Sequence, residues 1–195
     1  ANKFFMKEDQ LTGIILSGGK SSRMGMEKGL VDFQGKPLIS YAVSVLESIV
    51  DSIIIGANNE LDSYKKFGHQ VVEDEIRGIG PIGGLVSTLR HADTQKNIVI
   101  SCDMPFINPE LLCYLIQNMG DADVVVATQG PNKTEPLCGV YSQKAIPIIE
   151  DAIKNDQYKI LDLFDKVSFK SLLINETLPF YSDNLFYNIN RPEDI

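Results

Sequence analysis

Short runs rich in valine and isoleucine alternate along this chain with longer amphipathic segments, and this alternation limits the fold more than any other feature. The apolar runs are nearly continuous, which is typical of strands buried on both faces of a parallel sheet. The predicted strands are Thr12–Leu16, Ser52–Ile55, Gln70–Val72, Asn97–Ser101 and Asp123–Thr128. The predicted helices are Pro37–Ile49, Glu60–Phe67, Ile82–Ala92 and Asn108–Met119. This order predicts right-handed βαβ units and an α/β fold, a doubly wound, mostly parallel sheet flanked by helices.

After Gln129 the alternation is less regular. Residues 130–133 predict a turn, because glycine, proline and asparagine favour turn conformations. The remaining segments are a predicted strand at Leu137–Ser142, a predicted helix at Ala145–Asn155, and Tyr158–Asp165, Val167–Leu173 and Phe186–Ile189. No internal repeat or long linker divides the sequence, so we expect one domain over residues 1–195, with residues 1–10 as a flexible N-terminal extension.

The composition disfavours several classes of function. A net charge of −8 at pH 7 argues against non-specific nucleic-acid binding, which needs a basic face. No apolar run approaches the ~18 residues that span a bilayer, and the N-terminus lacks the apolar core of a signal peptide. Cys102, Cys113 and Cys138 form no CxxC pair, which disfavours a structural zinc site or a disulfide framework. We therefore expect a cytoplasmic protein that binds neither nucleic acid nor membrane.

The segment Leu16–Gly29, LSGGKSSRMGMEKG, directly follows the first predicted strand. In a doubly wound sheet, ligands bind where loops leave the carboxyl ends of the strands. Paired glycines let backbone N–H groups approach an anion. Residues 20–36 carry four cations and two carboxylates: Lys20, Arg23, Lys28 and Lys36 against Glu27 and Asp32. This local positive charge in an acidic chain predicts a site for a polyanion.

Two familiar nucleotide motifs do not fit this segment. LSGG resembles the signature of ABC-type ATPases, but that signature lies well downstream of a P-loop, and only fifteen residues precede it here. A P-loop that ends in Gly19, Lys20 and Ser21 needs glycine at position 14, where Ile14 stands. The segment also lacks the G-x-G-x-x-G spacing of a dinucleotide site.

The whole segment closely resembles the L-[AS]-G-G-x-S-x-R-M-G-x-x-K signature of the molybdenum cofactor guanylyltransferase family of nucleotidyltransferases. Further matches follow in the family's order: Gln34–Leu38, Val71–Asp74, Gly80–Leu85, Cys102–Pro105, Glu135–Leu137 and Asn188–Asp194. The resemblance therefore covers about the whole chain and implies a Rossmann-like fold of the nucleotide-diphospho-sugar transferase type. It also implies transfer of GMP from GTP to the molybdopterin cofactor, with release of pyrophosphate. Molybdenum-insertion proteins and molybdoenzymes are the candidate protein partners.

The resemblance also assigns roles around the triphosphate. Nucleotidyl transfer depends mainly on aligning two anions and neutralising their charge. Arg23 and Lys28 are the candidate catalytic cations, since a guanidinium fits phosphate oxygens and an ammonium supplies a compact charge. The backbone against which base and phosphates lie corresponds to Leu16, Ser17, Gly18 and Gly19. Asp103, after a predicted strand, corresponds to the family's ligand for Mg²⁺, the implied cofactor, and is a third candidate catalytic residue.

Further residues are assigned to the base and the acceptor. Asp74 matches a residue of the family's GTP site, and its carboxylate can accept hydrogen bonds from the N1–H and amino groups of guanine. Gly80 begins a glycine-rich loop that enters a helix and exposes N–H groups. Asn188 and Asn190 are candidates for binding the acceptor, or for organising the turn before Arg191. Glu135–Leu137 is expected to approach the acceptor pocket.

One departure from the family pattern leaves alternatives open. The family's second strand often ends in Asn-Ala-Asn, whereas this chain has Gly56-Ala57-Asn58. A nucleotide contact there must come from the backbone, from water or from Asn58. The second glycine of LSGG favours the guanylyl branch, because cytidylyl relatives usually carry L-A-A-G. The alternatives are cytidylyl transfer, transfer to a sugar phosphate, and a nucleotide-binding regulatory module with an incomplete site.

Overall fold

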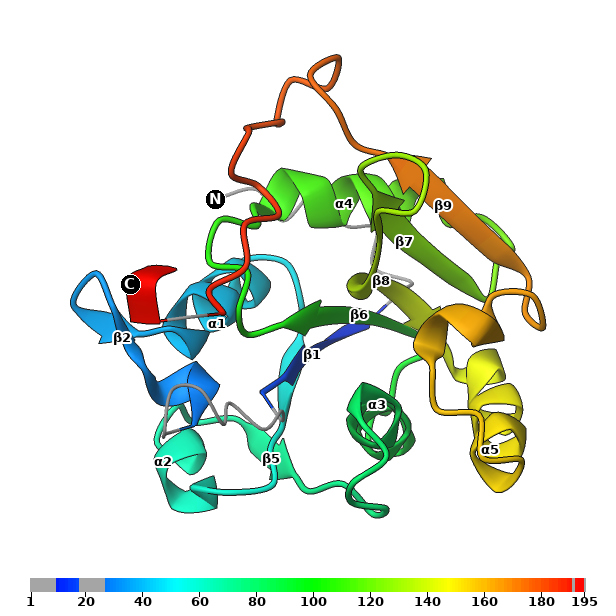
Figure 1. Ribbon diagram of the computed structural model, residues 1–195, viewed down its shortest axis with the longest axis horizontal. Coiled ribbons are helices and arrows are strands. Elements are labelled where there is room, and N and C mark those ends of the chain that lie inside the picture. The colour runs from blue at the N-terminus through cyan, green and yellow to red at the C-terminus, as the bar shows by residue number, and fades with distance from the viewer. Residues whose placement is uncertain (1–9, 18–26, 191, 195) are drawn as a thin grey trace.

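Seven strands form one sheet in the order β5-β4-β1-β6-β8-β7-β9, in a computed structural model that describes residues 10–17, 27–190 and 192–194 (Figure 1). The strands are β1 Leu11–Leu16, β4 Ser52–Gly56, β5 Gln70–Val72, β6 Lys96–Ser101, β7 Val124–Thr128, β8 Thr134–Ser142 and β9 Phe169–Leu173. Only β8 runs antiparallel to its neighbours in this sheet, so the predicted mostly parallel sheet is confirmed. A separate ribbon pairs β2, Asp32–Phe33, with β3, Lys36–Pro37.

Helices cover both faces of the sheet (Figure 1). The α-helices are α1 Ile39–Glu47, α2 Leu61–Lys65, α3 Pro81–Arg90, α4 Pro109–Asn118 and α5 Ile146–Lys154, and the 3₁₀ helices are η1 Lys28–Leu30, η2 Gln143–Ala145, η3 Ile160–Leu163 and η4 Pro192–Asp194. Buried residues of α1, α2 and α4 join one core cluster, and those of α3 and α5 join the other. None of the helices in the described part of the chain has the length and apolar character that crossing a bilayer requires.

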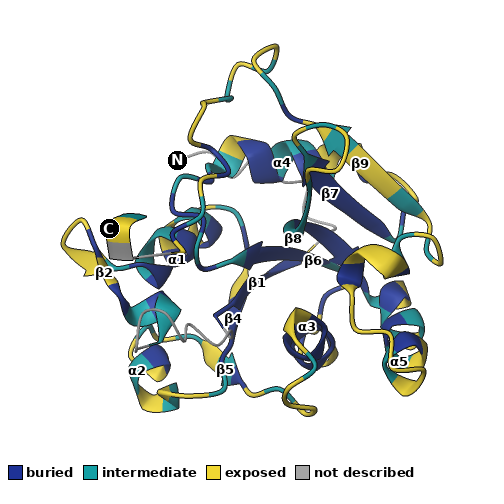
Figure 2. Cartoon of the chain, viewed as in Figure 1, coloured by how far each residue is buried: buried dark blue, intermediate teal, exposed yellow. Residues whose placement is uncertain are grey.

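The central strands are buried on both faces, as their continuous apolar runs predict. All six residues of β1 are buried, whereas edge strand β9 has no fully buried residue (Figure 2). The five strands predicted before Gln129 differ from the observed ones by no more than one residue at either end. The predicted cap of α4 is also confirmed, because the Asn108 side chain accepts a hydrogen bond from Leu111 N at 2.9 Å.

Two of the errors in the predicted boundaries fall at hairpins. The helix predicted from Pro37 begins at Ile39, because Gln34 and Gly35 turn the chain with φ of 53° and 87° and Pro37 then pairs in β3. The strand predicted from Leu137 begins at Thr134, which pairs with Thr128 across the turn at residues 130–133. Pairing with β7 therefore extends β8 back to the end of the predicted turn, through residues 134–136 that local composition did not mark as strand.

The order of the strands creates a switch point beside β1. The chain builds β1, β4 and β5 in one direction and then returns to the other side of β1 to form β6. Leu16 lies opposite Gly56 on one side and Ser101 on the other, so the residues that follow all three strands emerge together. In open α/β sheets the crevice at such a switch point is where ligands bind.

Candidate active site

Three side chains from distant parts of the chain meet at the switch point. The ammonium of Lys28, in η1, donates hydrogen bonds to Asp103 Oδ2 and to Asn190 Oδ1, each at 2.6 Å. The side chains of Lys28 and Asp103 are only 18% and 15% exposed. Partial exclusion of water strengthens the attraction between these two charges. The structure thus brings together three of the residues predicted from the sequence.

Asp103 is held in place by the backbone around it. Cys102 N donates to Leu16 O at 3.2 Å, so the chain still follows β1 as it leaves β6. The carbonyl of Asp103 accepts a hydrogen bond from Ile189 N at 2.9 Å. Ile189 is fully buried in a small cluster with Phe33 and Leu38, and this burial brings the following residue, Asn190, to the site.

Asp194 supports Asn190, a role that sequence reasoning missed. The backbone N–H of Asn190 donates to Asp194 Oδ2 at 2.8 Å, and Tyr187 OH donates to Asp194 Oδ1 at 2.8 Å. Asp194 belongs to the terminal motif that carries the family resemblance, but nothing in the sequence distinguished a structural carboxylate there from a solvated one.

The residues at this site fit a magnesium ion. Asp103 Oδ1 is buried and has no hydrogen-bond partner among the described residues, although its other oxygen is bound by Lys28. A buried carboxylate oxygen without a partner is costly, and a divalent cation removes that cost. Within the described ranges, no group of three or more His, Cys, Asp and Glu side chains could hold a metal. This sparse donor set suits Mg²⁺, which commonly takes one or two carboxylates together with phosphate oxygens and water.

Asn58 and Asp74 form a second pair, two strands away from β6. Asn58 Nδ2 donates to Asp74 Oδ2 at 2.8 Å, and Asp74 N donates to Asn58 Oδ1 at 2.9 Å. This reciprocal pair joins the loops that follow β4 and β5. Burial raises the pKa of Asp74, with Asn58 and Arg77 opposing that effect. Water is therefore partly excluded from this carboxylate, and binding of a ligand with two hydrogen-bond donors would be favourable there.

The first turn of α3 packs against Asp74 through glycines. A Cβ at Gly84 would lie 3.2 Å from Asp74 Oδ1, and one at Gly83 would lie 2.7 Å from Ile76 O. The helix begins at Pro81, after Gly80 with φ of 82°. The glycines let α3 and the loop before it approach closely.

Gly56 stands where the family often has asparagine, and packing explains why a small residue fits. A Cβ there would lie 3.0 Å from Thr88 Cγ2 and 3.1 Å from Leu16 Cδ2. Gly56 O also accepts the N–H of Ser17 at 2.8 Å. Leu16 and Thr88 thus occupy the space of the missing side chain.

Glu135 lies on the other side of Asp103, on β8. Its Oε1 accepts a hydrogen bond from Gln129 Nε2 at 2.8 Å. Burial raises the pKa of Glu135, and the negative charge of Asp103 raises it further, against the opposing effect of Gln129. The electrostatic effect of Asp103 shows that Glu135 lies near it; that Glu135–Leu137 approaches the acceptor pocket stays a prediction.

The remaining predicted residues have different surroundings. The amide of Asn188 donates to Phe186 O at 3.0 Å, so it organises the local turn and does not join Lys28. Lys36 lies over the Tyr41 ring, 3.9 Å from its centroid, and not beside Lys28. Gly18, Gly19, Lys20 and Arg23 lie outside the described residues, and their roles stay predictions.

Sequence reasoning also missed a support for η1. Glu27 Oε1 accepts a hydrogen bond from Asn59 Nδ2 at 2.8 Å, and Glu27 Oε2 accepts one from the buried Tyr64 OH at 3.4 Å. These contacts fix the chain immediately before Lys28. The sequence showed Glu27 only as a charge that opposes the basic segment.

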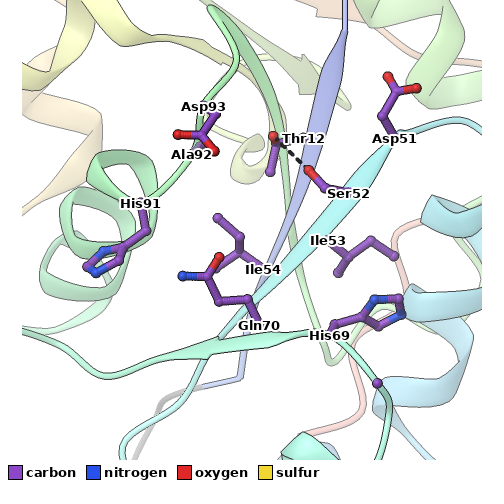
Figure 3. A pocket seen from close by; sticks show the side chains of 11 residues that line it. Thr12, Asp51, Ser52, Ile53, Ile54, His69, Gln70, His91, Ala92 and Asp93 are labelled. Atoms are coloured by element: carbon purple, nitrogen blue, oxygen red, sulfur yellow. Dashed lines mark hydrogen bonds between the residues drawn. The ribbon is translucent and has the colours of Figure 1, made fainter.

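A separate hollow of about 360 Å³ lies at the opposite, amino-terminal edge of the sheet (Figure 3). It is lined by Thr12, Asp51, Ser52, Ile53, Ile54, Gly68, His69, Gln70, His91, Ala92 and Asp93. The two histidines have partners elsewhere: His69 pairs with Glu47 at 3.2 Å and His91 contacts Ser87 O at 2.8 Å. Among the residues that line this hollow, no cation–carboxylate pair like that of Lys28 and Asp103 faces a ligand.

Comparison with known proteins places this geometry in context. A family model described as MobA-like NTP transferase domain matches residues 13–168. The chain is 39% identical over 178 residues to a probable molybdenum cofactor guanylyltransferase of Flavobacterium johnsoniae, covering 91% of this chain and 92% of the relative. It is 31% identical over 195 residues to a molybdenum cofactor guanylyltransferase of Vibrio parahaemolyticus, covering 97% and 95% of the two chains.

A solved structure has the same architecture. The crystal structure of molybdopterin-guanine dinucleotide biosynthesis protein A from Archaeoglobus fulgidus superposes with a TM-score of 0.79 at 27% identity, covering 94% of each chain. The aligned part of this chain is longer than the span of residues 13–168 that the family model matches.

Proposed function

The chain belongs to the MobA-like NTP transferase family, and we propose that it transfers GMP from GTP to the molybdopterin cofactor, forming molybdopterin guanine dinucleotide and pyrophosphate. The observation that carries this proposal is the Lys28–Asp103–Asn190 cluster at the switch point, with one buried Asp103 oxygen left without a partner among the described residues. A cation and a carboxylate in this arrangement suit a triphosphate and its metal.

The reaction is an in-line displacement at phosphorus. A phosphate oxygen of the acceptor attacks the α-phosphorus of GTP and forms a new P–O bond. The bond from the α-phosphorus to the bridging oxygen breaks, and pyrophosphate leaves with its electron pair. The acceptor phosphate is itself the nucleophile, so the protein needs to supply only alignment and charge neutralisation.

Lys28 and Asp103 do different parts of this work. The Lys28 ammonium contributes a compact positive charge beside the phosphates, and Asn190 limits where that ammonium can go. Asp103 would hold Mg²⁺ through its unpartnered oxygen. When bound, Mg²⁺ neutralises phosphate charge and stabilises the leaving pyrophosphate. Arg23 is a further candidate cation in this proposal.

Base recognition is assigned to the Asn58–Asp74 pair and the start of α3. The Asp74 carboxylate can accept hydrogen bonds from the N1–H and 2-amino groups of guanine, a pair of adjacent donors that cytosine and adenine lack. Asn58 holds this carboxylate in place, and Gly83 and Gly84 let the first turn of α3 pack against it. Leu16, Ser17 and Gly80 complete the wall of the proposed GTP site, and contacts from Gly18 and Gly19 stay predictions from the sequence.

The proposal includes a cytoplasmic location, which the three free cysteines Cys102, Cys113 and Cys138 support, since a reducing compartment keeps thiols free. Delivery of the product to molybdoenzymes, and receipt of the acceptor from a molybdenum-insertion protein, are parts of the same proposal.

The direct test is pyrophosphate release from GTP, CTP or ATP with Mg²⁺ and molybdopterin. We expect release with GTP, and a loss of about 10²-fold or more in kcat/KM for Lys28→Gln, because that cation is aimed at developing charge. Lys65→Gln is the matched control, since Lys65 forms an exposed pair with Asp62 on α2. A preference for CTP would indicate a cytidylyltransferase, and nucleotide binding without turnover on any acceptor would indicate a regulatory module.

A further inference from the structure

Glu135 lies at the carboxyl edge of the sheet, outside the part to which the proposed GTP site is assigned. The proposed GTP residues follow β1, β4 and β5, all on one side of β6. Glu135 lies on β8, the neighbour of β6 on the other side. Ile100 of β6 pairs with Cys138, so residues 134–137 extend past the paired part of β6 and run beside the loop that carries Asp103. An acceptor that approaches Asp103 from this side must pass β8.

The Glu135 carboxyl is half-buried, and its hydrogen bond with Gln129 uses only part of its capacity to accept hydrogen bonds. Burial makes its charged form costly, which raises its pKa, and Asp103 adds to that cost. Within the described part of the chain, its hydrogen-bond partner is the Gln129 amide, on Oε1. Two carboxylate oxygens have roughly four acceptor positions, so most of them are open. A ligand with two adjacent N–H donors would fit these open acceptor positions.

The proposed acceptor carries such donors. A pterin has a 2-amino-4-oxopyrimidine ring, and its N3–H and 2-amino groups lie side by side. Guanine carries the same edge, so the two halves of the proposed product present the same pair of donors. The protein has a half-buried carboxylate with a raised pKa on each side of Asp103: Asp74 toward β5 and Glu135 on β8. Each is held by a side-chain amide, Asn58 in one case and Gln129 in the other.

We propose that Glu135 determines acceptor specificity by accepting hydrogen bonds from the N3–H and 2-amino groups of the pterin ring, as Asp74 does for guanine. This inference rests on the proposed function, because it takes molybdopterin as the acceptor. Gln129 is a positioning residue that fixes the orientation of the carboxylate. The shared edge gives one protein two similar recognition points for two different substrates.

The test compares pterin with lumazine, the analogue in which a carbonyl replaces the 2-amino group. Each is titrated into the full chain saturated with Mg²⁺ and a non-hydrolysable GTP analogue, so that Asp74 is already occupied. We expect wild-type protein to bind pterin at least about 10-fold more tightly, since lumazine presents a carbonyl oxygen to a carboxylate. Glu135→Gln offers one donor and one acceptor, which suit lumazine, so the preference should fall to about 2-fold or less.

Two further variants control this experiment. Glu176→Gln neutralises an exposed carboxylate in the loop after β9 and should keep the wild-type preference. Gln129→Leu removes the amide that holds Glu135 and should weaken the preference without abolishing binding of the GTP analogue. With molybdopterin as substrate, Glu135→Gln should raise the acceptor KM about 10-fold, while the Kd for GTP stays within about 2-fold.

The outcomes separate this inference from the proposed function. If wild-type protein fails to bind the GTP analogue, the proposed function fails. If it binds the analogue but does not prefer pterin to lumazine, or if Glu135→Gln keeps the wild-type preference, Glu135 does not read the pterin edge and the inference is overturned.

Discussion

At the amino ends of β1 and β6, buried polar side chains form hydrogen bonds with one another. At the carboxyl end of β6, in contrast, a buried polar atom lacks a hydrogen-bond partner among the described residues. Thr94 Oγ1 donates to Thr12 Oγ1 at 2.9 Å and contacts Asn97 Oδ1 at 2.9 Å, and Asn97 Nδ2 reaches Tyr141 O at 3.3 Å. Thr12 also contacts Ser52 at 3.1 Å, at the side of the amino-edge hollow (Figure 3). This network satisfies its own members.

The carboxyl edge has the opposite arrangement. Asp103 Oδ1 is buried without a hydrogen-bond partner among the described residues. The carboxyls of Asp74 and Glu135 have raised pKa values because of burial. A closed polar network stabilises a fold, while open polar groups lower stability and are compensated when a ligand binds. The contrast supports the proposed division, in which the amino edge stabilises the fold and the carboxyl edge binds the ligands.

The largest expected effect comes from Asp103→Asn at the open edge. The substitution keeps the shape of the side chain and removes its charge, so we expect kcat to fall by about 10²-fold or more while the melting temperature changes little. Pyrophosphate release and a thermal unfolding curve measure the two effects. Activity within about 3-fold of wild type would show that Asp103 does not act on the phosphates.

Asn97→Leu, at the amino ends of β1 and β6, should have the opposite effect: it should lower stability and leave nucleotide binding unchanged. Asn97 is fully buried, and its loss leaves Thr94 and the carbonyl of Tyr141 short of partners. We expect the free energy of unfolding to fall by about 1–3 kcal/mol in urea titration, with GTP affinity of the folded protein unchanged. A large loss of GTP affinity at full folding would break the division between the two edges.

Gly56→Asn tests whether packing excludes the family's usual asparagine. Because Thr88 Cγ2 and Leu16 Cδ2 crowd the position, we expect a loss of stability of about 1–3 kcal/mol. The matched double variant adds Thr88→Ser, which removes the crowding methyl group and keeps the hydroxyl that donates to Gly84 O. Recovery of part of the lost stability in urea supports the packing explanation, whereas equal losses in both variants refute it.

The smallest expected effect is on the pH dependence of stability. The pKa of Asp74 is raised in the folded state, so protonation of Asp74 favours folding. The stability that this protonation adds is fully present below the unfolded pKa of about 3.9 and is lost as pH rises through the folded pKa. Asp74→Asn should therefore lose less stability than wild type between about pH 4 and 7 in urea titrations. Asp62→Asn is the control: Lys65 lowers the pKa of Asp62, so the stability linked to that carboxyl changes only below about pH 4, and the profile between pH 4 and 7 should match that of wild type. A steeper profile for Asp74→Asn would contradict the burial of this carboxyl.

Much of the fold was predictable because its signals are local. Continuous valine and isoleucine runs marked the buried strands, and Asn108 with Pro109 marked the start of α4. The errors came where partner strands decided the outcome, as at Pro37 and Thr134. Composition at a hairpin does not show how far its two strands pair.

The sequence alone predicted that Leu16–Gly29, Asp74 and Asp103 lie at the carboxyl edge, since each comes at or just after the end of a predicted strand. It did not separate Asn188 from Asn190, two similar residues in one short motif. The tertiary structure decided that difference: Ile189 is buried against Phe33 and Leu38 and donates to Asp103 O, which leaves Asn188 facing Phe186 O and brings Asn190 to Lys28. Lys28 and Asn190 lie 162 residues apart, and a contact over that separation depends on the packing of the whole chain, which no local pattern encodes.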